Sequence, residues 1–278
     1  MLALKILFWL SLGALLWTHA LYPLAAVKLR VPIAHVEAGL RSFDRAMPEE
    51  HNRVLTDHLS DILLAHSEEA ILNLSREGIT SGVHLVGNTM IDSLLEHLDA
   101  ARARRSWEQF DLRPGDYALV TLHRPALVDD PVKLRAVTDG LIALAADRPV
   151  LFPIHPRTLR NLQAAGDDRR LRDAGVIATD PLGYLDFLCL EADAAFVVTD
   201  SGGVQEETTA LGVPCVTLRA NTERPATVDQ GTNVLAGTAR EGVLAAVEQA
   251  MAKQPAARWP SGGRPVWGWR MATARSST

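Results

Sequence analysis

The chain has 278 residues, a net charge of −5 and a pI near 6.0. That length has room for one large domain or two modest ones, and the acidic balance excludes a general nucleic-acid-binding protein. Cys189 and Cys215 lie far apart in apolar runs, which predicts two buried, reduced thiols. The Cys and His spacings match no zinc site, so the sequence predicts no metal centre.

The first 27 residues are almost all apolar or small, with one Lys and one His. Three interpretations remain open for them. Residues 2–27 are long enough to span a bilayer, and Lys5 followed by an apolar run resembles a signal peptide. We favour the third interpretation, a buried helix that leads into a strand at 31–34, so membrane attachment is not the expected outcome.

After this segment, short apolar runs alternate with helical stretches. The expected strands lie at 31–34, 62–65, 83–86, 117–122, 150–154, 175–178, 194–199 and 215–218. The expected helices lie at 48–59, 68–77, 89–104, 131–146, 158–165, 184–190, 203–211 and 240–252. Pro48 and Pro131 suit first helical positions. The alternation predicts an α/β fold, in which parallel sheets carry helices on both faces.

A domain boundary is expected at Gly87-Asn88-Thr89, where a strand ends and a long amphipathic helix begins. We therefore expect two Rossmann-like halves. The first, residues 1–88, has only about three strands and is incomplete for such a half, and its residues 1–19 are atypical. The second half, residues 89–253, is complete. Residues 254–278 hold four Arg, no acid and three of the six Trp, and they predict a disordered tail.

Ligands of open α/β sheets bind beyond the carboxyl ends of the strands, and VTDSGGVQEE, residues 198–207, begins at one such end. The helix that follows is opened by Ser201, Gly202 and Gly203. Glycines let a ligand approach the backbone and the free N–H groups of a helix start favour an anion, so a diphosphate fits. Glu206 and Glu207 are expected in the first turn, where one acid would reach ribose hydroxyls. A plain turn capped by Asp200 is the alternative.

Two histidines also follow expected strands directly. His123 and Arg124, in TLHRP, end the strand at 117–122. Arg is well suited to phosphate, and His acts as an acid or base near neutral pH. His155, in PIHPRT, follows the next strand along the chain. A surface His-Arg pair and a turn histidine are the alternatives for these two sites.

The stretch HVEAGLRSFDRAMPEEHNR, residues 35–53, places many charges just past an expected strand. Glu37 lies at one end of the loop, and Glu49 lies in the first turn of the helix at Pro48. Folded back, the loop would bring both carboxylates into one cleft, whereas solvated loop charges are the alternative. Together, the four strand-end stretches predict a cleft between two halves that binds a diphosphate-linked ligand and moves protons.

Four motifs in this order carry a resemblance: HVEAGLRSFDRAMPEEHNR, GNTMIDSL, TDSGGVQEE and NTERPATVDQGTN. They closely resemble the non-hydrolysing UDP-N-acetylglucosamine 2-epimerases, and the similarity runs continuously from Ala25 to Ala252. The resemblance implies a two-domain, GT-B-like fold and an isomerase that interconverts UDP-N-acetylglucosamine and UDP-N-acetylmannosamine for surface polysaccharides. In such enzymes UDP is eliminated across C1–C2 and then added back, without a metal or nicotinamide cofactor.

The resemblance also implies roles for single residues. The predicted catalytic residues are Glu37, Glu49 and His123. The predicted substrate-binding residues are Arg124, His155, Phe187, Ser201, Gly202, Gly203, Glu207 and Arg224. In the family, the two acids move protons at the sugar and the histidine helps UDP leave. Phe187 matches a position beside the uracil, and Glu207 matches the acid that binds the ribose.

Some family features have no match in this sequence. The family's first strand and GTRPE-type loop have no counterpart before Ala25, and no Asp stands around residues 13–15, where the family carries GDT. Ala126 and Leu127 replace the Glu and Asn of the family's HRxENVDDP, and the tail after residue 253 lacks the closing helix. We therefore expect an N-terminally truncated member, with the poor solubility or marginal stability of a sheet that exposes an edge.

Two alternatives to the epimerase accordingly stay open: an inactive UDP-binding remnant, or an epimerase for a related UDP-diacetamido sugar. A glycosyltransferase of the same fold is disfavoured, because transfer to an acceptor does not need the paired acids. The expected partner is a UDP-sugar and not a nucleic acid, and the expected location is the cytoplasm. A homodimer is the assembly that the resemblance suggests, since members of the family are commonly dimers.

Overall fold

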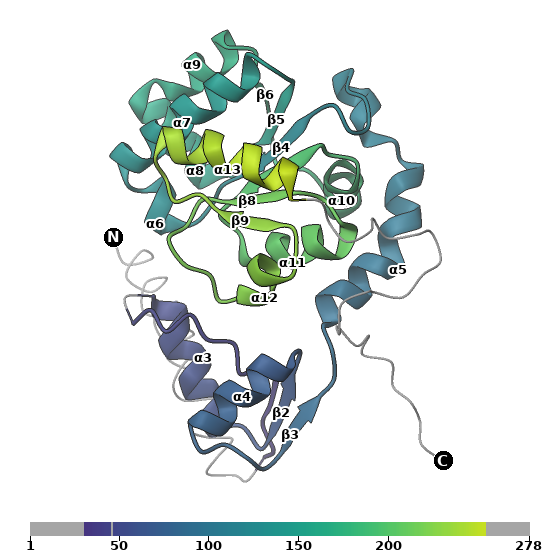
Figure 1. Ribbon diagram of the computed structural model, residues 1–278, viewed down its shortest axis with the longest axis vertical. Coiled ribbons are helices and arrows are strands. Elements are labelled where there is room, and N and C mark those ends of the chain that lie inside the picture. The colour runs from purple at the N-terminus through teal and green to yellow at the C-terminus, as the bar shows by residue number, and fades with distance from the viewer. Residues whose placement is uncertain (1–30, 46, 254–278) are drawn as a thin grey trace, which may run out of the picture. The chain divides into compact units, whose positions relative to one another are not determined.

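The structure is a computed structural model that describes residues 31–45 and 47–253 (Figure 1). The described residues form two compact units, one ending at Asn88 and the other beginning at Thr89. Each unit has a parallel sheet with helices packed against it, which confirms the predicted α/β class. The expectations for residues 1–30 and for the tail at 254–278 lie outside the described residues.

The first unit contains a three-stranded parallel sheet in the order β1-β2-β3. Its elements are β1 (Ala34–Ala38), α3 (Pro48–Leu59), β2 (Ile62–Ala65), α4 (Glu68–Arg76) and β3 (Val83–Leu85). The hydroxyl of Ser67 caps α4 by accepting the N–H of Ala70 at 3.2 Å. Leu74 of α4 packs against Ala38 and Leu63 of the sheet, and these side chains form a small core.

The first strand does not lie where the sequence predicted it. We expected residues 31–34, but pairing with β2 runs from Ala34, opposite Ile62, to Ala38, opposite Ala65. Pro32 has no N–H to give to a ladder, so the apolar run VPIA is a poor strand. The strand instead uses AHVEA, whose residues alternate in exposure. Glu37 therefore lies inside β1, at a register irregularity, and not past its end.

The second unit contains a six-stranded parallel sheet in the order β6-β5-β4-β7-β8-β9. Its strands are β4 (Ala118–Thr121), β5 (Val150–Pro153), β6 (Ile177–Thr179), β7 (Phe196–Thr199), β8 (Cys215–Thr217) and β9 (Asn233–Leu235). Within the unit this is the doubly wound order of a Rossmann fold, in which the order of successive strands along the sheet reverses between the first and the fourth strand. That reversal lies between β4 and β7, which pair in register from Ala118 to Thr121.

Helices cover both faces of this sheet (Figure 1). They are α5 (Thr89–Ala103), η2 (Ser106–Phe110), α6 (Pro125–Val128), α7 (Pro131–Ala145), α8 (Pro156–Ala165), α9 (Asp167–Asp173), α10 (Tyr184–Ala192), α11 (Gly202–Leu211), α12 (Pro225–Asp229) and α13 (Arg240–Ala252). Val120 and Val198 pack with α7 and α13, whereas Leu119 and Val197 pack with α5 and α10. Because successive strand residues meet opposite helical layers, the strands read as continuous apolar runs.

Five elements of the second unit were not predicted: η2, α6, α9, α12 and β9. Each has three to seven residues, too few to show a hydrophobic period. The sequence of α9 is DDRRLRD, in which Leu171 is the apolar residue that reaches the core. β9 begins with the buried polar residue Asn233. The prediction for the cysteines is confirmed, since Cys189 and Cys215 are both free and buried.

Candidate active site

The predicted His-Arg and Ser-Gly-Gly residues follow β4 and β7, the two neighbouring strands between which the strand order of the second unit reverses. His123 and Arg124 follow β4, and Ser201 follows β7, the strand next to it. In a doubly wound sheet, the connections from two such strands leave toward opposite faces and open a crevice at the carboxyl ends. The described geometry therefore places these residues where open α/β sheets bind their ligands.

The side chain of Asp200 links the loop after β7 to the loop after β4. Its carboxylate is fully buried. It accepts the backbone N–H of His123 at 3.0 and 3.1 Å and that of Arg124 at 2.8 Å. The Nδ1 atom of His123 lies 3.3 Å from Oδ1 of the same carboxylate. Burial raises the pKa of Asp200, while the Arg124 N–H bond and the His123 charge act to lower it.

This use of Asp200 decides between two interpretations of the turn before α11. A plain turn capped by Asp200 was the alternative, but the N-cap residue is Ser201, and its side chain makes no capping bond. The carboxylate of Asp200 is instead bonded to the loop after β4. The first N–H groups of α11 are therefore left without a side-chain cap, which is the condition for binding an anion there.

Gly202 opens α11 at a crowded point. A Cβ atom built there would lie 2.6 Å from Oε1 of Glu223 and 2.7 Å from Nη1 of Arg224. A side chain at 202 would thus displace these charged groups, which explains the glycine by close approach and not by a positive φ. The prediction that Glu206 and Glu207 lie in the first turn of this helix is wrong. The helix already begins at Gly202, so Glu206 is its fifth residue.

Glu207 lies one turn into α11 and is mostly buried. Burial raises its pKa to about 7, with a further contribution from the charge of Glu206. Glu191 of α10 is fully buried, and burial together with the charge of Glu207 raises its pKa well above the ordinary value. Two acids with raised pKa values therefore lie at the predicted ribose position.

Arg224 and Glu223 lie in the loop between β8 and α12. Arg224 is the N-cap residue of α12, and its N–H donates to the hydroxyl of Thr222 at 3.0 Å. Its guanidinium pairs with Glu206 at 2.6 Å and with Glu223 at 3.1 Å. Arg124 reaches the same Glu223 carboxylate at 3.1 Å. The second unit thus brings Arg124 and Arg224 together, although they are far apart in the sequence.

His155 and Phe187 occupy two further strand-end connections. His155 caps α8, because its Nδ1 accepts the N–H of Arg157 at 3.2 Å. This bond leaves the ring proton on Nε2. The His155 ring lies 6.1 Å from the His123 ring, centroid to centroid. His155 is therefore a turn histidine, as the alternative interpretation held, and it is also a neighbour of His123. Phe187 is half-buried on α10 and packs at the edge of the core.

Glu37 and Glu49 belong to the first unit. Glu37 has a left-handed backbone, with φ 63°, at the irregularity in β1. A non-glycine residue in this conformation is strained, and such strain often accompanies function. Glu49 lies in the first turn of α3 and is exposed. No bond between Glu37 and Glu49 was found among the described residues, so their meeting in one cleft stays a prediction.

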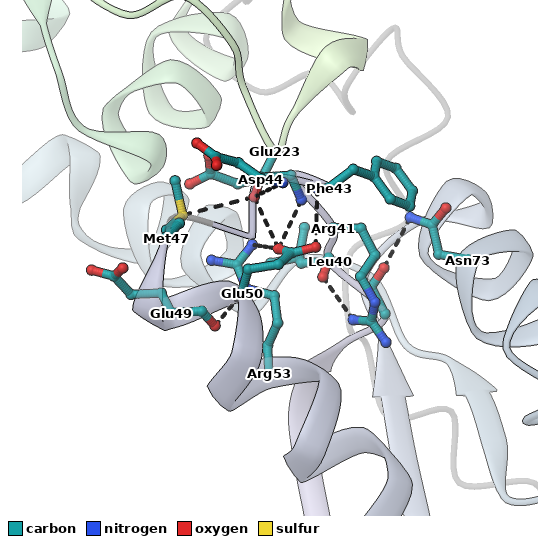
Figure 2. A network of polar contacts seen from close by, with 12 residues as sticks. Leu40, Arg41, Phe43, Asp44, Met47, Glu49, Glu50, Arg53, Asn73 and Glu223 are labelled. Atoms are coloured by element: carbon teal, nitrogen blue, oxygen red, sulfur yellow. Dashed lines mark hydrogen bonds and ion pairs between the residues drawn. The ribbon is translucent and has the colours of Figure 1, made fainter. Parts of the chain in front are cut away.

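The buried acid beside Glu49 was not predicted. Glu50 accepts the N–H and the hydroxyl of Ser42 at 2.9 and 3.0 Å and the N–H of Phe43 at 3.0 Å. It also lies 3.5 Å from Nη1 of Arg53. Figure 2 shows the Glu50 carboxylate pointing into the loop between β1 and α3, while that of Glu49 points away. Glu50 therefore shapes the loop that joins the two predicted acids.

A second polar network supports the start of this loop. Asp57 is fully buried and is bonded to Nδ1 of His35 at 2.5 Å, the N–H of Gly39 at 3.1 Å and Nη1 of Arg41 at 2.7 Å. Arg41 forms a bidentate pair with Glu77 at 2.6 and 2.7 Å. Burial raises the pKa of Asp57, but bonds from His35 and Arg41 outweigh it and lower that pKa overall.

Neither a metal-binding cluster nor a membrane-spanning helix occurs in residues 31–45 and 47–253. These residues contain no cluster of three or more His, Cys, Asp or Glu side chains arranged to hold a metal ion. In the same part of the chain, none of the helices combines the length and the apolar character needed to cross a bilayer.

Comparison with known proteins gives this geometry a family. The family model described as UDP-N-acetylglucosamine 2-epimerase matches residues 17–275. The chain is 46% identical over 232 residues to the UDP-N-acetylglucosamine 2-epimerase of Methanocaldococcus jannaschii, covering 81% of this chain and 63% of that protein. It is 41% identical over 235 residues to the UDP-2,3-diacetamido-2,3-dideoxy-D-glucuronate 2-epimerase of Pseudomonas aeruginosa, covering 83% of this chain and 64% of that protein.

A solved structure agrees with the sequence comparison. The crystal structure of the M. jannaschii UDP-GlcNAc 2-epimerase in complex with UDP-GlcNAc and UDP superposes with a TM-score of 0.77 at 46% identity. The match covers 83% of this chain and 65% of that one, so the chain spans a little under two thirds of the length of these relatives. The likeness confirms the GT-B-like fold class. The chain belongs to the UDP-N-acetylglucosamine 2-epimerase family.

Proposed function

We propose that the protein interconverts UDP-N-acetylglucosamine and UDP-N-acetylmannosamine. The observation that carries the proposal is the bonding of Asp200 to the loop of His123 and Arg124, beside the uncapped N-terminus of α11. A cation, a titratable imidazole and free N–H groups then converge at one place. This arrangement suits a diphosphate that must accept negative charge as it leaves.

The proposed reaction has two stages. In the first, a base removes the proton from C2 of the sugar, the C1–C2 double bond forms, and the C1–O bond breaks with its electron pair passing to UDP. In the second, UDP adds back to C1, and a proton is delivered to C2 from the opposite face. The overall change is redox-neutral, and the C2 proton is weakly acidic, so the base and acid must be well positioned.

We assign the roles as follows. Glu37 and Glu49 move the protons at the sugar. His123 protonates or stabilises the departing diphosphate, together with Arg124 and the N–H groups that follow Ser201. The strained backbone of Glu37 supports its role, because strain is retained most often where a side chain must be aimed.

The uridine part of the substrate is assigned to the other predicted residues. Phe187 lies beside the uracil, and Glu207 accepts the ribose hydroxyls. His155 and Arg224 contact the remainder of the substrate near the diphosphate. Arg224 is supported by its ion pairs with Glu206 and Glu223, which hold its guanidinium against the start of α11.

The test is a coupled assay for UDP-N-acetylmannosamine formation, run beside calorimetry of UDP binding. We expect binding and turnover in the wild-type chain, and binding without turnover in Glu37→Gln and Glu49→Gln. UDP binding by a wild-type chain that forms no epimer would contradict the proposed activity and identify a UDP-binding remnant. A parallel assay with a UDP-2,3-diacetamido sugar distinguishes the alternative substrate, which the P. aeruginosa relative is named for.

The setting of the reaction is also proposed. A UDP-sugar epimerase of this kind would supply N-acetylmannosamine units for surface polysaccharides, and we place it in the cytoplasm. We expect a homodimer, which sedimentation equilibrium would detect as a mass twice that of the 30.2 kDa chain.

A further inference from the structure

A buried carboxylate in the second unit contacts three arginines, of which two are near it in the sequence and the third is 99 residues away. The side chain of Glu223 is almost fully buried. Its Oε2 lies 2.7 Å from Nη2 of Arg219, and its Oε1 lies 3.1 Å from both Nη1 of Arg224 and Nη2 of Arg124. We call these four residues the Glu223 cluster. Arg124 comes from the loop after β4, whereas the other three come from the loop after β8.

The Glu223 cluster carries a surplus of positive charge. Burial alone would raise the pKa of Glu223, but Arg219, then Arg224 and Arg124, lower it to about 2. The carboxylate is therefore ionised at neutral pH and has one negative charge for three guanidinium groups. Glu206 adds a second negative charge through its 2.6 Å contact with Arg224. Among the described residues, these contacts place two carboxylates against three guanidinium groups, in a place where burial strengthens electrostatic attraction.

The cluster lies against the start of α11. A Cβ atom on Gly202 would fall 2.6 Å from the Glu223 carboxylate and 2.7 Å from the Arg224 guanidinium. The uncapped N–H groups of α11 and the surplus positive charge are thus side by side. The backbone of Arg124 is also held in place, because its N–H donates to the carboxylate of Asp200 at 2.8 Å. Together they form a preorganised site for an anion.

One hydrogen-bond donor of the Glu223 cluster has no acceptor among the described residues. The side chain of Arg219 is only 9% exposed, and its Nη1 atom is buried with no hydrogen-bond partner among the described residues. A guanidinium has five N–H donors, and a buried donor that finds no acceptor is costly. Such a group in a native structure calls for an explanation, and an anionic ligand that completes its bonding provides one.

We propose that Glu223 is a positioning residue, which holds Arg124, Arg219 and Arg224 in one cluster against the N-terminus of α11 so that they bind the diphosphate of the UDP-sugar. Arg219 is thereby added to the predicted substrate-binding residues. The proposal rests on the proposed function, since it takes its ligand from that site. It predicts that Glu223 affects the diphosphate part of the ligand and leaves the uridine part unchanged.

The experiment compares the binding of UDP, uridine and inorganic pyrophosphate by calorimetry in the wild type and in Glu223→Gln. We expect the variant to bind UDP about tenfold or more weakly, because disordered guanidiniums lose charge-assisted bonds. Pyrophosphate binding should weaken with it, while uridine affinity should change by less than about twofold. Glu241→Gln is the matched control, because it removes one negative charge from an exposed residue, and it should bind all three ligands as the wild type does.

A second variant covers the case in which Glu223→Gln fails to fold. Arg219→Gln leaves Glu223 paired with Arg124 and Arg224, so the loop keeps its other ion pairs. It should weaken UDP and pyrophosphate binding with uridine binding unchanged. Unchanged or tighter UDP binding in a folded variant would overturn the proposal, as would an equal loss of UDP and uridine affinity, which marks a merely structural role.

The outcomes separate this proposal from the proposed function. If the wild type binds UDP and pyrophosphate but forms no epimer, the proposed activity fails and the role of Glu223 is still decided by the variants. If the wild type binds neither UDP nor pyrophosphate, the anion site itself is absent and the proposal about Glu223 is overturned.

Discussion

The carboxylate of Asp200, at the end of β7, accepts the backbone N–H of Arg124, beyond the end of β4, at 2.8 Å. This bond joins two loops that are 76 residues apart in the sequence. It also frees the start of α11 from a side-chain cap, because the residue that would have capped it is used elsewhere. A single buried acid thus both orders the His123-Arg124 loop and leaves an anion site open.

Replacing Asp200 by Asn tests this relationship. The amide group would place an NH2 donor against the N–H groups of His123 and Arg124, leaving buried donors unpaired. We expect Asp200→Asn to lower the free energy of unfolding by about 1–3 kcal/mol and to weaken UDP binding. Urea unfolding and calorimetry measure the two effects. Asp180→Asn, at an exposed position, is the control, and equal behaviour of the two variants would contradict the prediction.

The pKa of Glu207 predicts a pH dependence near neutrality. Because that pKa is raised to about 7, the folded chain binds the proton more tightly than the unfolded chain. The contribution to stability is therefore complete below the ordinary pKa of 4.5 and is lost as the pH rises through 7. Ribose binding runs in the opposite direction, because the ionised carboxylate is the stronger acceptor of hydroxyl hydrogen bonds.

Uridine is the ligand with which to measure this effect, since it has no phosphate that titrates in the same range. We expect its dissociation constant to rise about tenfold between about pH 8 and pH 6, as the ionised fraction of Glu207 falls. Glu207→Gln should bind uridine with a flat pH profile. A flat profile in the wild type would show that Glu207 does not bind the ribose in its ionised form.

The strained backbone of Glu37 predicts a separation of stability from activity. Glycine usually costs about 1 kcal/mol inside a strand, but it removes a left-handed strain of about the same size. Glu37→Gly should therefore leave stability unchanged while abolishing epimerisation. Val36→Gly, one residue earlier and without a positive φ, should show the ordinary cost. Hydrogen exchange of residues 34–65 compares the two, and equal losses of protection would argue against strain at Glu37.

Replacing the adjacent acids Glu49 and Glu50 of α3 by Gln should affect stability and turnover differently. Glu50 accepts three hydrogen bonds from Ser42 and Phe43, so Glu50→Gln should destabilise the loop by about 1–3 kcal/mol. Glu49 is exposed, so Glu49→Gln should leave the stability unchanged and abolish only the turnover. Unfolding curves and the epimerase assay, applied to both variants, test this division of roles. A stable Glu50→Gln chain would contradict it.

Local patterns predicted most of the elements but not their exact use. The helices at Pro48 and Pro131 begin where the sequence places them, because proline at a first helical position is a strong local signal. Strand β1 was misplaced, because the apolar run before it includes Pro32 while the real strand alternates. β9 was missed because three residues that begin with Asn233 carry no strand signal.

The sequence by itself determined the α/β class, the positions of most strand ends, and which of those ends carry His123, Arg124, Ser201 and Gly202. These depend on short-range signals: apolar runs, prolines and glycines, and the rule that ligands bind at strand ends. Only the tertiary structure decided which charged residues are structural and which are open to a ligand. Asp57, Asp200, Glu50 and Glu223 look like ordinary charged residues in the sequence, because their donors are brought to them by distant segments and their burial depends on the whole packed unit.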